Sequence, residues 1–265
     1  MTALTRPFFE LYRYRELMAL LVGRDLKVRY KRSVLGMFWT LLNPLLQMAV
    51  YTLVFRTIMK VGLPAFPVFL LSGLLPWTFI SVSATTSAHA LLNNQGLIRK
   101  VAVPQAVYPL AVVGSKLVDL LFSLAPLALI AALMGRPPSV AWLALLPALV
   151  AAIAFTTGLS LVFSSLMVFF RDTRHLVDIL FQVWFYLTPV LYPSSYVDGL
   201  PQRWIRSVLA LNPASPIVRC FQQAIYEQRL PDVSTLGAAL TCGAIALAVG
   251  FATFERLQHR HIHYF

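Results

Sequence analysis

Several long stretches of this sequence contain no Asp, Glu, Lys or Arg, and they limit the fold more strongly than any other feature. A helix needs about 20 apolar residues to cross the roughly 30 Å hydrocarbon core of a membrane. A core helix of a water-soluble protein has no reason to stay uncharged over that length. The uncharged stretches are 33–55, 61–98, 120–135, 137–170, 179–197 and 233–254. They predict a chain that crosses the membrane several times.

The composition agrees with this interpretation. The chain has 265 residues, of which 58% are hydrophobic and 12% are charged, whereas about a quarter are charged in an ordinary soluble domain. So few charges leave the surface of a soluble protein too apolar, and disorder requires low hydrophobicity. Both classes are therefore excluded.

We predict an all-α integral membrane protein with six transmembrane helices. The uncharged stretches place these spans at 35–58, 67–90, 108–134, 140–167, 174–192 and 234–255. The predicted organisation is a cytoplasmic head (1–34), one transmembrane domain (35–256) and a cytoplasmic tail (257–265). Within the transmembrane domain, 91–105 forms an inner loop and 193–232 an outer segment.

Basic residues predict the orientation, because Lys and Arg concentrate on the cytoplasmic side of membrane proteins. Six spans put both termini on one side. That side receives fourteen Lys and Arg residues and the other side receives seven, with Lys116 inside a span. Both termini are therefore expected in the cytoplasm. The net charge of +12 is then an orientation signal and a contact with membrane lipids, not a nucleic-acid site.

The head is too charged for a signal peptide, with eight basic and three acidic residues before any long apolar run. Apolar residues among these charges predict an amphipathic helix on the membrane surface over 8–31. The alternative is a solvated orientation tag. The basic cluster in this segment also suits an anion site at the cytoplasmic mouth. Its members are Arg24, Lys27, Arg29, Lys31 and Arg32.

Two spans carry uncharged polar and aromatic side chains that need partners inside a membrane. In the first span they recur every four residues, on one helix face. They suit a water-filled path, and helix–helix hydrogen bonding is the alternative. In the fifth span, rings and an amide suit a carbohydrate conduit, while an aromatic belt at the headgroups explains Tyr186 equally well. The two sets are Trp39, Asn43, Gln47 and Tyr51, and Phe181, Gln182, Trp184, Phe185 and Tyr186.

Lys116 and Asp119 stand three residues apart in the third span. This spacing puts both on one helix face, where they can neutralise each other. Proton coupling is the alternative role for such an intramembrane pair. In the fourth span, residues 156–165 include a glycine and several Ser and Thr residues, which permit close helix packing.

No motif for catalysis, a metal or a cofactor occurs. The chain lacks a Walker A loop and a nucleophile–base–acid set, so we expect a transport subunit rather than an enzyme. Cys220 and Cys242 are expected as free thiols. The alternating His259, His261 and His263 in the tail are expected to be solvated, with metal binding as the alternative.

Two non-spanning segments have patterns of their own. In the inner loop, Asn93 and Asn94 can cap a short helix that Pro104 ends. Such a surface helix suits docking to a soluble partner, through Asn93, Asn94, Gln95, Leu97, Ile98, Arg99 and Lys100. The outer segment is too long for a simple connection and holds two apolar runs between prolines. These runs predict two short helices that dip partway into the membrane.

An ordered set of motifs resembles the membrane subunits of ABC-2 type polysaccharide exporters, most closely O-antigen exporter permeases, with capsule and teichoic-acid exporters as near relatives. The motifs are RDLKVRYKRSVLGMFWTLLNPLL, FPVFLLSGLLPWTF, NNQGLIRKVAVP, FFRDTRHL, TPVLYP and LNPASPIV, and they follow one another over nearly the whole chain.

The resemblance implies a homodimer of six-span subunits in the bacterial inner membrane, bound to two ATP-binding subunits that use ATP and Mg²⁺. It implies a coupling helix at 93–103, an interface helix at 8–29 and re-entrant helices at 201–209 and 213–226. The first and fifth spans then line the path of a polysaccharide linked to a polyprenyl lipid through pyrophosphate. The basic cluster named above is expected to contact that pyrophosphate.

Three other functions are weighed against this one. An ABC-2 exporter of small amphiphiles would share the fold and the coupling helix. A proton-coupled secondary transporter would use Lys116 and Asp119 without any ATPase. A membrane-embedded glycan enzyme is disfavoured because no acid–base set occurs.

Overall fold

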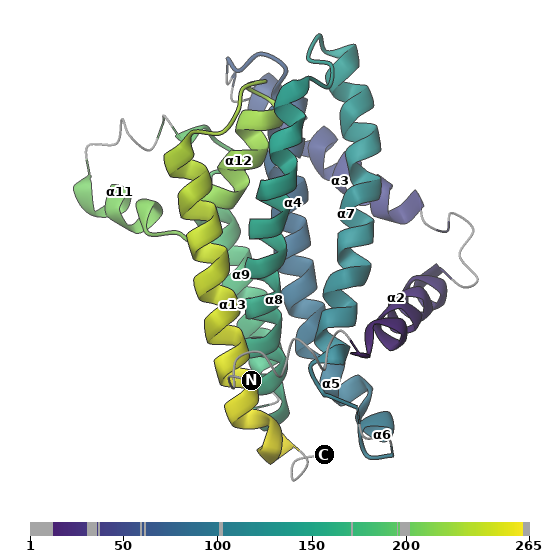
Figure 1. The fold of residues 1–265 in the computed structure, drawn as a ribbon. Coiled ribbons are helices and arrows are strands. Elements are labelled where there is room, and N and C mark those ends of the chain that lie inside the picture. The colour runs from purple at the N-terminus through teal and green to yellow at the C-terminus, as the bar shows by residue number, and fades with distance from the viewer. Residues whose placement is uncertain are drawn as a thin grey trace.

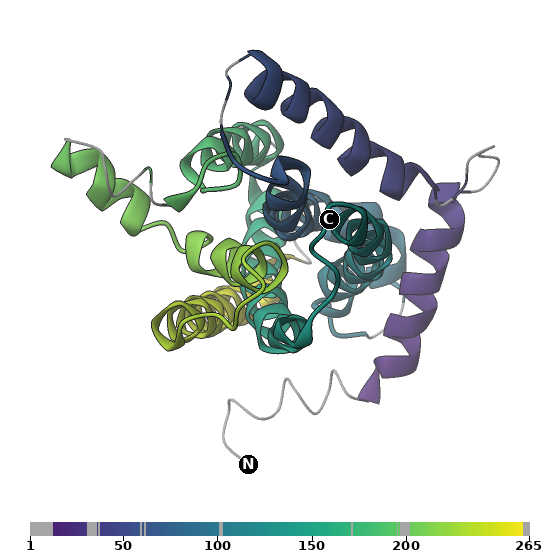
Figure 2. The same ribbon diagram turned by 90° about the horizontal axis from the view of Figure 1, so that it is seen from above.

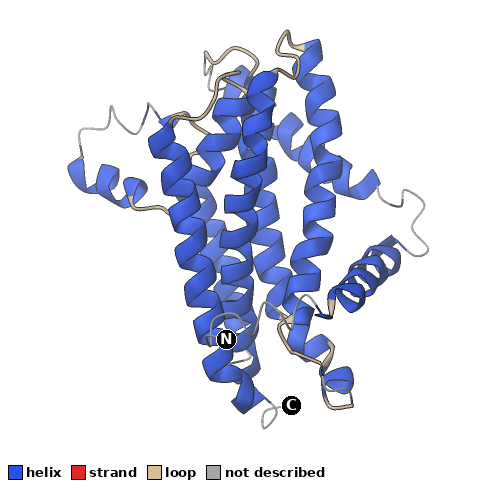
Figure 3. Cartoon of the chain, viewed as in Figure 1, coloured by secondary structure: helices blue, strands red, loops and turns tan. Residues whose placement is uncertain are grey.

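The fold was analysed in a computed structural model. It describes residues 13–30, 36, 38–58, 60, 62–100, 103–170, 172–194, 196 and 202–261, with the side chains of 29, 30 and 57 excepted. These residues contain helices and no strands (Figure 3), which confirms the all-α prediction. The elements are α2 (Arg15–Tyr30), α3 (Phe38–Thr52), η1 (Leu53–Ile58), α4 (Phe66–Ala88), α5 (Ala90–Asn93), α6 (Gln95–Ile98), α7 (Val107–Leu133), η2 (Val140–Ala144), α8 (Leu145–Phe169), α9 (Thr173–Leu187), α11 (Arg203–Ala210), α12 (Ser215–Ile225) and α13 (Val233–His261).

Five helical segments are long and apolar enough to cross a membrane. They are Phe38–Arg56, Phe66–Ala88, Val107–Leu133, Val140–Phe169 and Val233–His261. They correspond to the predicted first, second, third, fourth and sixth spans. The chain is therefore a multi-pass membrane protein.

The predicted fifth span, 174–192, corresponds to α9, which ends earlier than predicted. Its 15 residues extend for about 22 Å at 1.5 Å per residue, less than the thickness of a hydrocarbon core. The helix stops because Thr188 precedes Pro189 and adopts an extended backbone, with φ −98° and ψ 136°. Proline disfavours the helical conformation of the residue before it.

The long helices α4, α7, α8 and α13 run alongside one another in a bundle (Figure 1). Helix α2 lies crosswise toward one end of this bundle, on the same side as α5 and α6, and the C-terminal end of α13 lies at this end on the other side. The view from above shows α3 and α2 along the outside of the bundle and α11 extending away from it (Figure 2). We call the end with α2, α5 and α6 the inner end and the opposite end the outer end.

Helices α8 and α13 pack through small residues, as predicted for the fourth span. A Cβ atom at Gly158 would overlap the carbonyl oxygen of Ala246, and one at Gly243 would lie 2.7 Å from the carbonyl oxygen of Ala151. Thr156, Ser160 and Ser164 of α8 are buried. Lipid tails are as apolar as leucine, so close contact of this kind stabilises a membrane bundle more than the hydrophobic effect does.

The outer segment forms two short helices, α11 and α12, close to the predicted positions. Helix α12 is buried against α4, α8 and α13, and Ile217 and Phe221 have no exposed surface. Its Gln222 Nε2 donates to the carbonyl of Pro189 over 2.8 Å. The Arg136 guanidinium stacks 4.3 Å from the centre of the Tyr226 ring and donates to the Tyr226 carbonyl. The α7–α8 loop therefore fastens the end of α12.

Candidate functional site

The two predicted polar stripes lie on α3 and α9, and one aromatic contact joins them. The rings of Tyr51 and Phe185 have centroids 6.2 Å apart. Other polar and aromatic side chains of the two stripes are exposed on the surface of the chain, along the lengths of α3 and α9. They are Trp39, Asn43, Gln47, Gln182 and Tyr186.

Two members of the α9 stripe point into the bundle instead. Phe181 is buried, and its ring lies near those of Trp77 and Phe163. Trp184 is partly buried beside Trp77 and Phe155. Residues 181 and 184 are three apart and share the helix face that packs on the bundle. The sequence alone does not show which face of α9 is buried, and the prediction therefore grouped these two core residues with surface residues. These two rings hold α9 on the bundle.

A cavity of about 400 Å³ lies between α3, α4 and α7. Trp39 and Asn43 line one side of it, and Lys116 and Asp119 line another. The Lys116 ammonium lies 3.6 Å from the Asp119 carboxylate, and these side chains are 14% and 16% exposed. The predicted ion pair is therefore confirmed, and it faces the polar stripe of α3.

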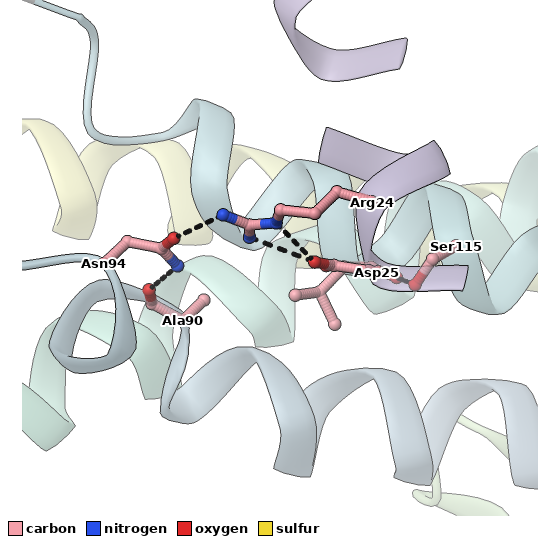
Figure 4. A network of polar contacts seen from close by, with 6 residues as sticks. Arg24, Asp25, Ala90, Asn94 and Ser115 are labelled. Carbon is pink, nitrogen blue, oxygen red and sulfur yellow. Dashed lines mark hydrogen bonds and ion pairs between the residues drawn. The ribbon is translucent and has the colours of Figure 1, made fainter. Parts of the chain in front are cut away.

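At the inner end, α2 is connected to the inner loop through Arg24. Its guanidinium donates to Asn94 Oδ1 over 3.2 Å and to Asp25 Oδ1 over 3.0 Å, and Asn94 Nδ2 donates to the carbonyl of Ala90 over 2.7 Å (Figure 4). Asn94 precedes α6 but makes no capping bond there, contrary to the prediction, because its side chain is engaged by Arg24 and Ala90.

A second cavity, of about 380 Å³, lies beside this connection and is lined by Arg24, Asp25, Asn93, Asn94 and Ser115 among others. Of the remaining basic cluster, Lys27 is exposed. Lys31, Arg32 and the side chain of Arg29 lie outside the described residues. The structure thus brings one arginine of the predicted anion site to the predicted coupling loop.

The inner loop contains two short helices, α5 and α6, rather than one. Helix α2 packs against α7, and its buried Leu21 belongs to the same apolar cluster as Ala90 and Leu91 of α5. The loop's own outward side chains are exposed: Asn93, Gln95, Leu97, Arg99 and Lys100. Ile98 is partly buried. Through this shared cluster and the Arg24–Asn94 contact, a displacement of the exposed inner loop can reach α2.

The C-terminal end of α13 closes onto the same region, which the sequence did not reveal. His261 is buried, its Nδ1 lies 2.7 Å from Gln105 Oε1, and its ring lies 5.5 Å from those of Phe169 and Phe254. The prediction of a solvated histidine trio is therefore wrong for His261, because α13 extends to this residue. His263 lies outside the described residues.

Asn212 is a second residue whose role sequence reasoning missed. It follows α11, is 6% exposed, and uses both ends of its amide. Its Oδ1 accepts from Trp184 Nε1 over 2.8 Å and from the backbone N–H of Ala214 over 3.0 Å. Its Nδ2 donates to the carbonyl of Leu187 over 3.0 Å and to Thr188 Oγ1 over 2.9 Å. Asn212 therefore ties the end of α9 to the outer segment.

The cysteines and the possible metal ligands were also compared with the sequence predictions. Cys220 and Cys242 are both free thiols, as predicted. In the described part of the chain, no three His, Cys, Asp or Glu side chains gather in a way that could hold a metal ion.

The model of the family described as ABC-2 type transporter matches residues 16–226. The chain belongs to the ABC-2 type transporter family. Membership implies that this ABC-2 chain works with ATP-binding subunits.

Several curated proteins resemble this ABC-2 chain over nearly its whole length. The O-antigen export system permease protein RfbA of Myxococcus xanthus is 38% identical over 248 residues, which cover 93% of this chain and 94% of that protein. RfbA of Klebsiella pneumoniae is 32% identical, covering 92% and 93%. The polysialic acid transport protein KpsM of Escherichia coli is 24% identical, covering 88% and 90%.

The contact between Arg24 and Asn94 predicts a functional coupling in this ABC-2 chain. We expect Arg24→Gln and Asn94→Ala each to lower transport about fivefold, at the low end of typical coupling energies. Because both side chains act through one contact, the double variant should transport no less than whichever single variant transports less. The measurement is transport per unit of protein in the membrane.

Arg13→Gln is the matched control, because Arg13 is exposed just before α2. The free energy of unfolding should change little in the Arg24 and Asn94 variants, because an exposed contact of a charged side chain contributes at most about 1 kcal/mol. Losses that add in the double variant would show that the two residues act separately.

Proposed function

We propose that this chain is the transmembrane subunit of an ATP-driven exporter that moves a polyprenyl-pyrophosphate-linked, O-antigen-like polysaccharide across the bacterial inner membrane. One observation carries the proposal. Polar and aromatic side chains stand exposed on α3 and α9, in a chain 38% identical over 248 residues to an O-antigen export permease. Amides on helices that would otherwise face lipid need polar partners, and sugar hydroxyls are such partners.

The proposed assembly is a homodimer bound to two ATP-binding subunits, which supply ATP and Mg²⁺. In it α9, continued by residues 188–192, is the fifth of six spans, and both termini are cytoplasmic. Helix α2 lies at the cytoplasmic membrane surface, and α11 and α12 are re-entrant from the outer side. The proposed path is lined by Trp39, Asn43, Gln47, Tyr51, Gln182, Phe185 and Tyr186. Phe181 and Trp184 support it from within the bundle.

In the proposed mechanism, closure of the two ATP-binding subunits displaces the inner loop. The Arg24–Asn94 contact passes this movement to α2, and α2 leads directly into α3. Movement of α3 relative to α9 then opens the path at the Tyr51–Phe185 contact. Weak, repeated contacts with rings and amides suit conduction, because each site must release what it binds. Arg24 and Lys27 would meet the pyrophosphate as the lipid arrives.

The deciding experiment is deletion of the gene, followed by analysis of the lipid-linked glycans and the surface polysaccharide. We expect lipid-linked polysaccharide to accumulate in the cell and to disappear from its surface. Intact surface polysaccharide combined with sensitivity to small amphiphiles would instead support the small-amphiphile exporter. A proton-coupled transporter would lose its pH dependence in Asp119→Asn and need no ATPase.

A double substitution tests the path itself. We expect Gln47→Leu with Gln182→Leu to lower polysaccharide export about tenfold, because two amides that stabilise sugars in transit are lost, each contributing about 0.5–1.5 kcal/mol. Leu240→Ala, on the exposed face of α13, is the control and should export normally. Surface polysaccharide is measured relative to the amount of chain in the membrane. Normal export in the double variant would remove these amides from the path.

A further inference from the structure

A cavity of about 370 Å³ lies at the outer end, where the end of α9, helices α11 and α12 and the start of α13 meet. The elements that form it lie toward the opposite end of the bundle from α2, α5 and α6 (Figure 1). Four elements that follow one another between Leu187 and Ala238 contribute to its wall. None of the residues that line it belongs to the proposed path, the ion pair or the inner loop.

The wall of this outer cavity is positively charged. Arg206 of α11 and Arg219 of α12 line it, and none of the described residues that line it is acidic. Among the described residues, neither guanidinium has a hydrogen bond or an ion pair with the protein. Asp232 interacts with Arg219 only through a longer-range Coulombic effect.

Asp232 is already engaged elsewhere. Its carboxylate accepts from Arg229 over 2.8 Å and from Gln223 over 2.8 Å. These hydrogen bonds, the one from Arg229 first, hold the pKa of Asp232 below its ordinary value. The Asp232 carboxylate is therefore engaged by Arg229 and Gln223, and it forms no ion pair with either cavity arginine.

The remaining wall is divided between hydroxyl groups and hydrocarbon. Hydroxyls come from Ser194, Ser215, Ser234 and Thr235. Leu187, Leu209 and Ala238 supply apolar surface beside them. Two cations, several hydroxyl donors and an apolar flank suit an amphiphile with an anionic head. Arginine pairs with phosphate oxygens through two parallel N–H bonds, which favours phosphate among such heads.

The position of the arginines strengthens this argument. Basic residues are disfavoured on the outer side of membrane proteins, and a charge near hydrocarbon requires a partner. Among the described residues no carboxylate lines the cavity beside these two arginines, so an anion from outside the chain suits them. The surrounding membrane offers that anion as lipid phosphate.

We infer that the outer cavity, through Arg206 and Arg219, binds the phosphate of a membrane lipid whose chain lies along Leu187, Leu209 and Ala238. The assignment to the outer leaflet rests on the proposed topology. The phosphate has two sources, the headgroup of a phospholipid or the pyrophosphate of the polyprenyl carrier after it has crossed. Both present the same chemistry to the cavity.

The test is lipid retention by the purified chain. The protein is placed in nanodiscs that contain phosphatidylglycerol and phosphatidylethanolamine in equal amounts, extracted, and its bound lipids are identified by native mass spectrometry. We expect phosphatidylglycerol to be retained selectively. Arg206→Gln with Arg219→Gln should lower this retention about tenfold or more, because charge-assisted hydrogen bonds of about 1.5–3 kcal/mol are removed.

Two further variants make the result specific. Arg203→Gln removes an exposed arginine of α11 that does not line the cavity, and it should retain lipid like the unaltered chain. Arg206→Lys with Arg219→Lys keeps both charges but loses the paired N–H geometry, so it should retain an intermediate amount. A melting temperature for each variant shows whether the chain has folded.

Adding a synthetic polyprenyl pyrophosphate separates the two sources. Displacement of phosphatidylglycerol supports the cavity as a site for the carrier, and undisturbed retention supports a phospholipid site. Retention without preference for the anionic lipid, or equal losses in Arg203→Gln and the double glutamine variant, would overturn the inference. A chain that exports another cargo would still retain lipid here, so failure of the proposed function is distinguishable from failure of this site.

Discussion

Gly158→Leu is expected to prevent the chain from accumulating in the membrane. Gly158 faces the backbone of α13, and even a Cβ atom there would overlap the carbonyl oxygen of Ala246. The contact is mutual, since a Cβ at Gly250 would overlap the carbonyl oxygen of Gly158. The obstacle is backbone, so no side chain can rotate away. Overpacking a core costs about 1–3 kcal/mol, and separating two helices along their seam should cost at least the upper value.

The measurement is the amount of chain in the membrane and the melting temperature of the fraction that is purified. Gly237→Leu is the matched control, because it introduces the same side chain on α13 where a Cβ meets open space. We expect Gly237→Leu to accumulate and melt like the unaltered chain. Equal accumulation of Gly158→Leu would show that α8 and α13 are not held by this backbone contact.

What the sequence predicted well depends on local or periodic features. Uncharged stretches located the long helices within a few residues, because a span must exclude charge over its whole length. The Lys116–Asp119 pair was predicted and found, since a spacing of three residues fixes two side chains on one helix face. The small residues of the fourth span predicted close packing, because small side chains allow two helix backbones to approach each other.

What it missed depends on contacts between distant segments. The contact of Arg24 with Asn94 joins residues 70 positions apart, and that of His261 with Gln105 joins residues 156 apart. Neither has a periodic signal. The end of α9 was misplaced although Pro189 marked it, because the uncharged stretch continues beyond the helix. Phe181 was grouped with surface rings because its buried face depends on where α4 and α8 lie.

The candidate sites show the same division. Residues on one helix could be grouped as candidates from their spacing alone, as in the stripe of α3. The outer cavity combines Arg206, Arg219 and Ser234 from three helices. From the sequence, the two arginines were only counted among the basic residues of the outer side. A site assembled from three helices becomes visible only once their packing is known.

Asn212→Ala is expected to detach the outer segment from α9 and to abolish export. The Asn212 amide makes four hydrogen bonds, which is its full capacity of two donors and two accepting lone pairs. Alanine would leave the Trp184 N–H and the Leu187 carbonyl without their partners in a region that is partly buried. Each unsatisfied buried group costs about 1–3 kcal/mol, so we expect a loss of several kcal/mol in the free energy of unfolding.

The consequence for transport follows from the position of these bonds. Trp184 also packs against Trp77 and Phe155, so loss of its hydrogen bond loosens the ring that holds α9 beside the proposed path. Ser207→Ala is the control, because that exposed hydroxyl bonds only the Arg203 carbonyl of its own helix. We expect the melting temperature and the surface polysaccharide to fall in Asn212→Ala and to stay unchanged in Ser207→Ala. Asn212→Asp keeps the shape but replaces both amide donors with an acceptor, so it should fail as well; export by Asn212→Asp at the unaltered level would mean that the bonds to Leu187 and Thr188 are dispensable.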